Sequence, residues 1–221
     1  MNNNKPILAI ETSEKICGVC LYFSDEKYFE SKINLKNSHS EKIFSSINYV
    51  LNTADINIDE VGEIAVSTGP GSFTGLRIGM SAAKGLALGG NLPITPVPTF
   101  EAIALQVKKY FKVNSEISIA ERVNSDEAYF TKINLGGKKI EYLISLQIKK
   151  IDDLKDIIGK EPIITNISFD DKIINCNLII PIGAPDPFYI ALWSKIFGAA
   201  VKTKEYDFLE PNYLKNFLVK R

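Results

Sequence analysis

The chain has 221 residues, of which 45% are hydrophobic, so it can bury a core in one large domain or in two small ones. Its 26 basic and 26 acidic residues cancel, which excludes a whole-molecule attraction to nucleic acid or to an anionic membrane. The first apolar run, Ile7–Ile10, is too short for a signal peptide or a membrane span, and three cysteines do not resemble a disulfide framework, so we expect a cytoplasmic protein that does not enter membranes.

The first half of the sequence predicts three strands, an amphipathic helix, and then strands alternating with helices. Apolar runs bounded by turn residues indicate the strands, and apolar residues at helical spacing indicate the helices. The expected strands are Ile7–Thr12, Ile16–Phe23, Tyr28–Leu35, Glu63–Thr68 and Ile94–Val97, and the expected helices are His39–Leu51, Gly75–Leu88 and Thr99–Phe111.

The second half repeats this order of elements. The expected strands are Ile117–Val123, Ala128–Leu135, Ile140–Leu146, Pro162–Ile167 and Leu178–Ile182, and the expected helices are Ile151–Ile158 and Pro187–Val201. Three antiparallel strands, a crossover helix and a further strand, occurring twice, predict two α/β lobes with a cleft between them. We place the N-terminal lobe at residues 1–112 and the second at 113–221, and we expect the apolar tail at 206–221 to dock back onto the first lobe.

The segment STGPGSFTGLRIGMSAAKGLALG, at residues 67–89, follows a strand and leads into a helix, as phosphate-binding loops do. A Walker A loop requires G-x-x-x-x-G-K-[ST], and Thr74 stands where the second glycine would follow Gly69. The dinucleotide fingerprint G-x-G-x-x-G also fails, because Gly75 comes one position too late. A looser anion site at the helix N-terminus stays open.

Four small residues recur at every fourth position of this helix: Gly75, Gly79, Ala83 and Ala87. They form a stripe almost without side chains, which lets another element approach closely. Glycine costs a helix about 1 kcal/mol relative to alanine, so the contact should offset that cost. The stripe faces either the protein's own sheet or a partner, and we predict a partner surface.

Few residues could carry catalysis. His39 is the single histidine, which excludes the H-E-x-x-H motif and multi-histidine metal cages. A helix start with Glu41 in its first turn accounts for that segment without chemistry. Glu11, Thr12 and Ser13 end the first strand where two-lobe phosphotransferases hold a metal-bound phosphate, which suggests a vestigial phosphate site. We expect no catalytic and no metal-ligating residue.

Cys17 and Cys20 form a C-x-x-C pattern, which occurs in metal and redox sites. Such a site would need a turn or a helix start and a second pair of ligands, and neither is present. The run Ile16–Phe23 instead predicts a buried strand, in which residues three apart point to opposite faces. We therefore predict two core cysteines.

Four segments together resemble the TsaB (YeaZ) family. They are ILAIETS at residues 7–13, HSE at 39–41, GPGSFTGLRIG at 69–79 and PNYLK at 211–215. The likeness covers nearly the whole first lobe, whereas the second lobe has Arg122-Val123-Asn124 in place of the family's D-A-R segment and keeps Glu127-Ala128-Tyr129. The resemblance implies an α/β fold with two lobes of the actin and Hsp70 type (ASKHA, a duplicated ribonuclease-H-like fold) that has lost its own catalysis.

The resemblance also implies a non-catalytic scaffold or activating subunit of the bacterial machinery that makes threonylcarbamoyladenosine in tRNA. Such a subunit binds a catalytic paralogue, TsaD, is joined by an ATPase, TsaE, forms a homodimer when alone, and meets tRNA only through the complex. ATP and a metal ion are then expected on the partner subunits, with no cofactor of its own. The implied interface consists of His39, Ser40, Glu41, Phe44, Gly75, Leu76, Gly79, Met80, Ala83 and Ala87. The alternative is an independent small-molecule kinase or peptidase of the same fold.

Overall fold

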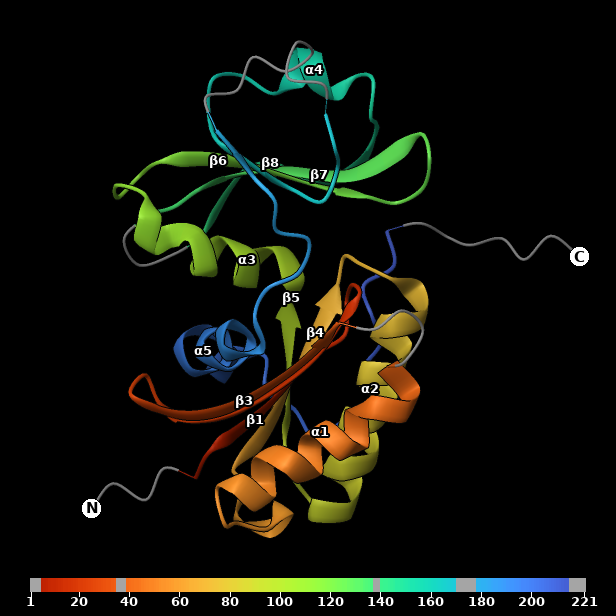
Figure 1. Ribbon diagram of the computed structural model, residues 1–221, viewed down its shortest axis with the longest axis vertical. Coiled ribbons are helices and arrows are strands. Elements are labelled where there is room, and N and C mark those ends of the chain that lie inside the picture. Colours follow the sequence, from red (N-terminus) through yellow and green to blue (C-terminus); the bar gives the residue numbers. More distant parts are fainter. Residues whose placement is uncertain (1–4, 35–38, 137–139, 170–177, 215–221) are drawn as a thin grey trace, which may run out of the picture. The chain divides into compact units, whose positions relative to one another are not determined.

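The structure describes residues 5–34, 39–136, 140–169 and 178–214. In this computed structural model, the predicted strands and helices form within a few residues of their expected bounds (Figure 1). Three helices are shorter than expected. α3 (Thr99–Val107) and α5 (Pro187–Phe197) each give way to a 3-10 turn, and α4 (Leu154–Ile157) keeps only the later half of its predicted range.

The first sheet has the strand order β3-β2-β1-β4-β5. Its strands are β1 (Ile7–Glu11), β2 (Ile16–Ser24), β3 (Lys27–Asn34), β4 (Glu63–Gly69) and β5 (Ile94–Pro98). The first three strands pair antiparallel, and β4 and β5 continue the sheet parallel to β1. Strand β4 is buried along its whole length, although its apolar run covers only residues 64–66 and the polar Glu63, Ser67 and Thr68 are buried with it.

Helices cover both faces of this sheet. α1 (His39–Thr53) and α2 (Phe73–Gly90) pack on one face, and α5 (Pro187–Phe197) packs on the other (Figure 1). The inner faces of α1 and α2 and the strands form one core, which includes Leu8 and Ile43. None of the helices in the described ranges is both long enough and apolar enough to cross a membrane.

The second sheet repeats the topology of the first, with the order β10-β9-β6-β7-β8. Its strands are β6 (Glu116–Arg122), β7 (Glu127–Asn134), β8 (Glu141–Lys150), β9 (Ile163–Thr165) and β10 (Ile179–Ile180). Strands β6, β7 and β8 pair antiparallel, and β9 and β10 run parallel to β6. Two sheets with one topology confirm the predicted duplicated α/β fold.

The division of the chain into units differs from the expected boundary at residue 112. One compact unit comprises residues 1–103 and 184–212, and the other comprises 104–183 and 213–221. Helix α5 therefore belongs with the first sheet, although we expected it in the second lobe. Its apolar side chains find their packing surface there, because Pro187 lies against Gly18 of β2 and the ring of Phe188 lies 5.6 Å from that of Tyr22.

The described part of the C-terminal tail docks on the first unit. The Tyr206 hydroxyl donates to the Leu92 carbonyl at 2.7 Å, and the Asn212 amide donates to the Thr68 carbonyl at 2.7 Å. These bonds hold Tyr206 beside the end of α2 and Asn212 beside the end of β4, as expected for a tail that docks on the first lobe. The remainder of the predicted tail, residues 215–221, lies outside the described residues.

Candidate functional site

The glycine-rich loop between β4 and α2 uses its amides to hold the helix in place. The Ser72 amide donates to the Ser13 carbonyl at 2.6 Å, and the Gly75 amide donates to the Ser72 hydroxyl at 3.2 Å. At the start of the loop, the Gly69 amide donates to the Thr99 hydroxyl at 3.1 Å. These three donors are engaged within the fold, so they would not contribute to the looser anion site that the sequence left open.

Glu11, Thr12 and Ser13 follow one another at the end of β1, but their side chains do not form one cluster. The Glu11 carboxyl is fully buried, and one of its oxygens accepts the Ser13 amide at 2.5 Å. Thr12 points to the opposite face of the sheet, where its hydroxyl lies beside Gly79 of α2. The three side chains therefore do not converge on one point, and the vestigial phosphate site stays a prediction.

Burial raises the pKa of Glu11 to about 7. Hydrogen bonds involving Ser13 and Ser67 lower it by less, and the charge of Glu14 raises it further. The second oxygen of the Glu11 carboxyl is buried and has no hydrogen-bond partner among the described residues. Burial therefore favours the neutral form of this carboxyl up to about neutral pH.

The stripe of small residues on α2 faces the protein's own sheet, which corrects our prediction of a partner surface. A Cβ atom at Gly75 would lie 2.0 Å from the Thr12 carbonyl oxygen, and one at Gly79 would lie 2.2 Å from the Thr12 hydroxyl. Ala83 and Ala87 are fully buried, and Leu76 and Met80 on the same helix are also buried. The spacing showed that something approaches closely, but periodicity alone does not identify which element that is.

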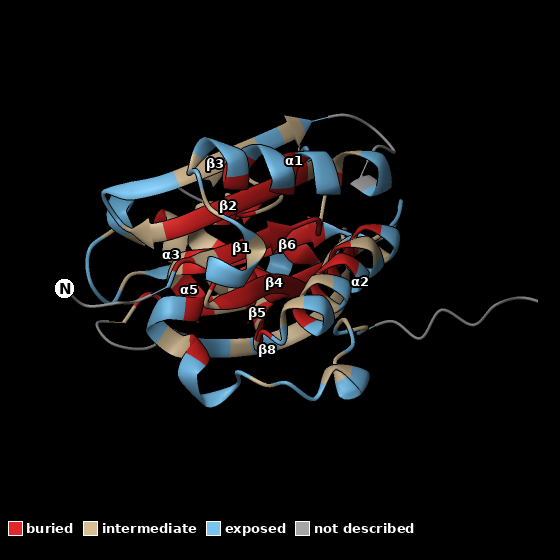
Figure 2. Ribbon diagram, turned by 90° about the horizontal axis from the view of Figure 1, so that it is seen from below, coloured by how far each residue is buried: buried red, intermediate tan, exposed pale blue. Residues whose placement is uncertain are grey.

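The outer sides of α1 and α2 are exposed (Figure 2) and meet in an apolar groove of about 340 Å³. The groove is lined by Ser40, Ile43, Phe44, Arg77, Ile78, Ser81 and Ala82. Phe44 is 53% exposed, a large fraction for an aromatic ring on a helix. Of the predicted interface residues, Ser40 and Phe44 line the groove and Glu41 is exposed beside it, while His39 begins α1 and its side chain lies outside the described atoms.

Sequence reasoning missed Ile43 of α1 and the four groove residues of α2, which are Arg77, Ile78, Ser81 and Ala82. Those of α2 lie beside the small-residue stripe and could have been found as the face that the stripe leaves outward. The Arg77 guanidinium stacks on the ring of Phe73, with 3.9 Å between the charge centre and the ring centroid. The groove thus combines an apolar floor with one cation at its edge.

Two exposed glycines on α2 have no explanation within the fold. A Cβ atom at Gly85 or at Gly89 would meet nothing within 4 Å, so neither position needs glycine for internal packing. They continue the outward line from Ser81, and Leu88 beside them is 72% exposed. A helix with bare backbone on its outer side allows close approach by a second helix.

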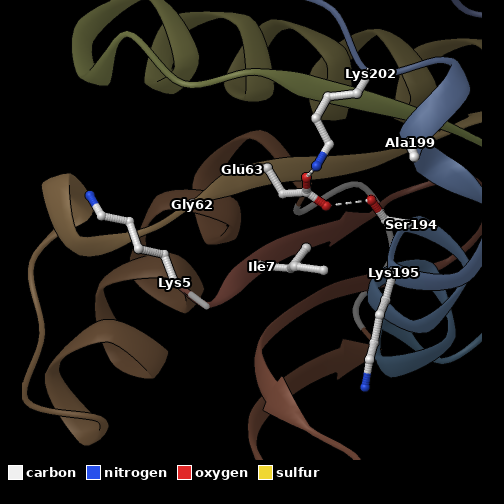
Figure 3. Close-up of a pocket in the computed structure, with 8 residues that line it drawn as sticks. All are labelled: Lys5, Ile7, Gly62, Glu63, Ser194, Lys195, Ala199 and Lys202. Atoms are coloured by element: carbon white, nitrogen blue, oxygen red, sulfur yellow. Dashed lines mark hydrogen bonds and ion pairs between the residues drawn. The ribbon is translucent and has the colours of Figure 1, made fainter. Parts of the chain in front are cut away.

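A second hollow, of about 380 Å³, lies where strands β1 and β4 begin (Figure 3). It is lined by Lys5, Ile7, Gly62, Glu63, Ser194, Lys195, Ala199 and Lys202. Lys202 forms an ion pair with the buried Glu63 carboxylate, which also accepts the Ser194 hydroxyl at 2.6 Å. Figure 3 shows Lys5 and Lys195 pointing away from that carboxylate, so the ammonium groups do not converge on one ligand.

Cys17 and Cys20 are free and buried in β2, as predicted. Burial raises the pKa of the Cys17 thiol to about 11 and that of Cys20 well above its ordinary value, so neither forms a thiolate at neutral pH. In the described ranges, no group of three or more histidine, cysteine, aspartate or glutamate side chains is arranged to hold a metal ion.

We expect both thiols to resist labelling in the native protein. In a Cys176→Ser background, a small thiol reagent should modify neither residue until the protein is unfolded, because the strand is closed on both faces. Mass spectrometry of the labelled protein would measure this. Rapid labelling of both thiols, or one zinc ion bound per chain, would contradict the core assignment.

Comparisons with known proteins agree on one group of relatives. The family model for TsaD, tRNA N6-adenosine threonylcarbamoyltransferase, matches residues 33–172, more than half of the chain. The chain is 31% identical over 131 residues to the tRNA threonylcarbamoyladenosine biosynthesis protein TsaB of Haemophilus influenzae, covering 59% of this chain and 54% of that protein. It is also 31% identical over 191 residues to TsaB of Buchnera aphidicola subsp. Baizongia pistaciae, covering 76% of this chain and 86% of that protein. The chain thus spans about half the length of the first relative and most of the second.

Among solved structures, the chain resembles YeaZ from Pseudomonas aeruginosa with a TM-score of 0.77 and 18% identity. The match covers 95% of this chain and 100% of that protein. At this identity the likeness establishes the fold, which is the duplicated α/β architecture described above.

Proposed function

The chain belongs to the TsaB (YeaZ) family, and from this premise we propose that it is a non-catalytic subunit of the machinery that makes threonylcarbamoyladenosine in tRNA. Its relatives in the family are named as biosynthesis proteins of that modified nucleoside. In this role the chain binds a catalytic, TsaD-like protein, and a TsaE-like ATPase joins the pair. The neutral overall charge is in keeping with tRNA being held by the complex rather than by this chain.

The observation that carries the proposal is the apolar groove between α1 and α2. An exposed aromatic ring, an apolar floor and the bare backbone at Gly85 and Gly89 together form a surface that suits a partner's helices. The family model for TsaD spans residues 33–172, which include both helices, so a TsaD-like protein offers a comparable pair. Packing of two such pairs supports a heterodimer, and the same packing with a second copy supports a homodimer.

ATP and a metal ion belong on the partner subunits in this proposal. The support is that the loop amides of Gly69, Ser72 and Gly75 are engaged within the fold, and that the side chains of Glu11 and Thr12 point to opposite faces of the sheet. The same geometry speaks against the alternative of an independent small-molecule kinase. The presence of a single histidine in the sequence supports the assignment of catalysis to the partner.

Replacing Phe44 with aspartate is expected to weaken binding to the TsaD-like subunit about 30-fold or more, a loss of about 2 kcal/mol. The reason is that a charge would replace an aromatic side chain at the centre of the groove. Sedimentation or calorimetry with the two purified subunits would measure it. The melting temperature should stay unchanged, because Phe44 is largely exposed in the free protein.

Tyr49→Asp is the matched control, because Tyr49 is 59% exposed on the same helix but does not line the groove. A second variant, Gly85→Leu, fills the open space on α2 without touching the fold and should also block association. Unchanged binding by both Phe44→Asp and Gly85→Leu would remove the groove from the interface. Equal losses in Phe44→Asp and Tyr49→Asp would show a nonspecific effect of charge.

A further inference from the structure

Glu11 joins the end of β1 to the first turn of α2 through an unbroken chain of contacts. Its carboxyl accepts the Ser13 amide at 2.5 Å, and the Ser13 carbonyl accepts the Ser72 amide at 2.6 Å. Ser72 is the N-cap of α2, where its hydroxyl accepts the Gly75 amide. A change at the carboxyl therefore reaches the helix N-terminus through two hydrogen bonds.

The end of β1 and the first turn of α2 are in direct backbone contact. A Cβ atom at Gly71 would lie 2.4 Å from the Ser13 carbonyl oxygen, and one at Gly75 would lie 2.0 Å from the Thr12 carbonyl oxygen. Backbone thus packs directly on backbone along the first turn of α2. Any movement of residues 12–13 must displace this turn, and packed interiors transmit such shifts because they are poorly compressible.

The titratable groups beside Glu11 do not balance a charge on it. Glu14, in the turn after β1, is acidic and raises the pKa of Glu11, and the Cys17 thiol on β2 interacts with the same carboxylate. Strand β4 contributes the Ser67 hydroxyl, which is uncharged. The second oxygen of the Glu11 carboxyl has no hydrogen-bond partner among the described residues.

The charges on the far side of β2 are already paired. Gly18 lies opposite Glu11 in the sheet, and Lys32 of β3 lies opposite Gly18, roughly 10 Å from β1. The Lys32 ammonium binds Asp186 at 2.9 Å and Glu30 at 3.4 Å. From α5, the uncharged Pro187 packs against Gly18. An ionised Glu11 would therefore be a buried charge that lacks a cation of its own, which is a costly arrangement.

We propose that protonation of Glu11 controls the position of the first turn of α2 and, through it, the α1/α2 groove, so that partner binding weakens as the carboxyl ionises. The bond from the Ser13 amide favours the ionised carboxylate, but burial disfavours that form by more, so the protonated form is the one that rests in the contacts described above. The ionised form is relieved by moving residues 11–13 toward water. This displaces the first turn of α2 and with it the following turn, where Arg77 and Ile78 line the groove. The consequence for binding rests on the proposed function, whereas the movement of α2 does not.

The direction of the pH dependence follows from the burial of the carboxyl. Its pKa is about 7 in the folded protein, above the ordinary value of 4.5 that applies to the unfolded chain. The raised pKa makes a contribution to the free energy of unfolding that is present in full below about pH 4.5. This contribution decreases as the pH rises and is lost above pH 7. Partner binding should follow the protonated fraction across pH 6 to 8.

The first test measures the dissociation constant of the complex with the TsaD-like subunit at pH 6 and pH 8. If only the protonated form binds, a pKa near 7 predicts about tenfold weaker binding at pH 8 for the wild type. Glu11→Gln, a neutral isostere, should change less than twofold between the two pH values. The matched control Glu14→Gln removes a neighbouring acid that raises the pKa of Glu11, so its binding should still weaken between pH 6 and pH 8, with the midpoint moved to lower pH. Equal pH dependence in Glu11→Gln and wild type would overturn the proposal.

The second test needs no partner and separates this inference from the proposed function. Amide hydrogen exchange of residues 72–79 in the isolated chain, corrected for the intrinsic effect of pH, should lose protection between pH 6 and 8 in the wild type and not in Glu11→Gln. If the two subunits did not bind at either pH, the proposed interface would be wrong. The exchange data would still show whether ionisation of Glu11 displaces the first turn of α2. Identical exchange in the two proteins would overturn it, and circular dichroism would confirm that the variant is folded.

Discussion

Gly75→Ala is expected to destabilise the first unit by about 3 kcal/mol, although it adds only a methyl group. The added Cβ atom would lie 2.0 Å from the Thr12 carbonyl oxygen. This oxygen belongs to the backbone, so it cannot move away by a change of side-chain rotamer. Either β1 or the first turn of α2 must move, and both are held by the hydrogen bond from Ser72 to Ser13. Urea unfolding followed by the fluorescence of Trp193, the single tryptophan, would measure the loss in this unit.

Gly85→Ala in the same helix is the matched control and should have the opposite effect. Its new methyl group meets open space, so the helix gains about 1 kcal/mol from the higher helix propensity of alanine. The two variants therefore differ by about 4 kcal/mol for one chemical change at two glycines of α2. Equal stability of the two proteins would show that the inner face of α2 is not packed on β1 as described.

Lys132→Met is expected to destabilise the second unit by about 3 kcal/mol. The Lys132 ammonium binds the Glu161 carboxylate at 2.8 Å, and the two side chains are only 17% and 10% exposed. In the variant, Glu161 would keep a hydrogen bond from Ser118 but would remain a buried charge without its cation. Hydrogen exchange of the β6 and β7 amides would report the loss in this unit separately.

Acidification should reduce the penalty of Lys132→Met. Burial raises the pKa of Glu161, but the hydrogen bonds from Lys132 and Ser118 outweigh it and hold the pKa below its ordinary value. This pair therefore stabilises the wild type at neutral pH and stops doing so as the pH falls through the pKa of Glu161. In the variant, Glu161 takes up a proton more readily, so the two proteins should converge in stability at low pH.

Lys32→Met provides the comparison for an exposed ion pair. Lys32 binds Asp186 at a similar distance, 2.9 Å, but the two side chains are 40% and 36% exposed. Solvent screens such a pair, so the loss should stay below about 1 kcal/mol. A loss in Lys32→Met as large as in Lys132→Met would contradict the role given to burial.

The sequence alone determined the elements and their repetition. Apolar runs such as Ile7–Ile10 and the amphipathic stretch at His39–Leu51 predicted strands and helices whose bounds agree with the structure to within a few residues. The prediction works because a helix or strand that buries one face must place apolar residues at regular intervals along the sequence. The C-x-x-C pattern was also assigned correctly to a strand, since Cys17 and Cys20 are both core residues.

Only the tertiary structure decided which surface each pattern faces. The spacing of Gly75, Gly79, Ala83 and Ala87 required a close neighbour, but a strand of the same chain and a partner helix impose the same pattern. The groove around Phe44 and the return of α5 to the first sheet likewise depend on contacts between segments far apart in the chain. Periodicity records that a face is packed, and the identity of what packs against it is set by the path of the whole chain.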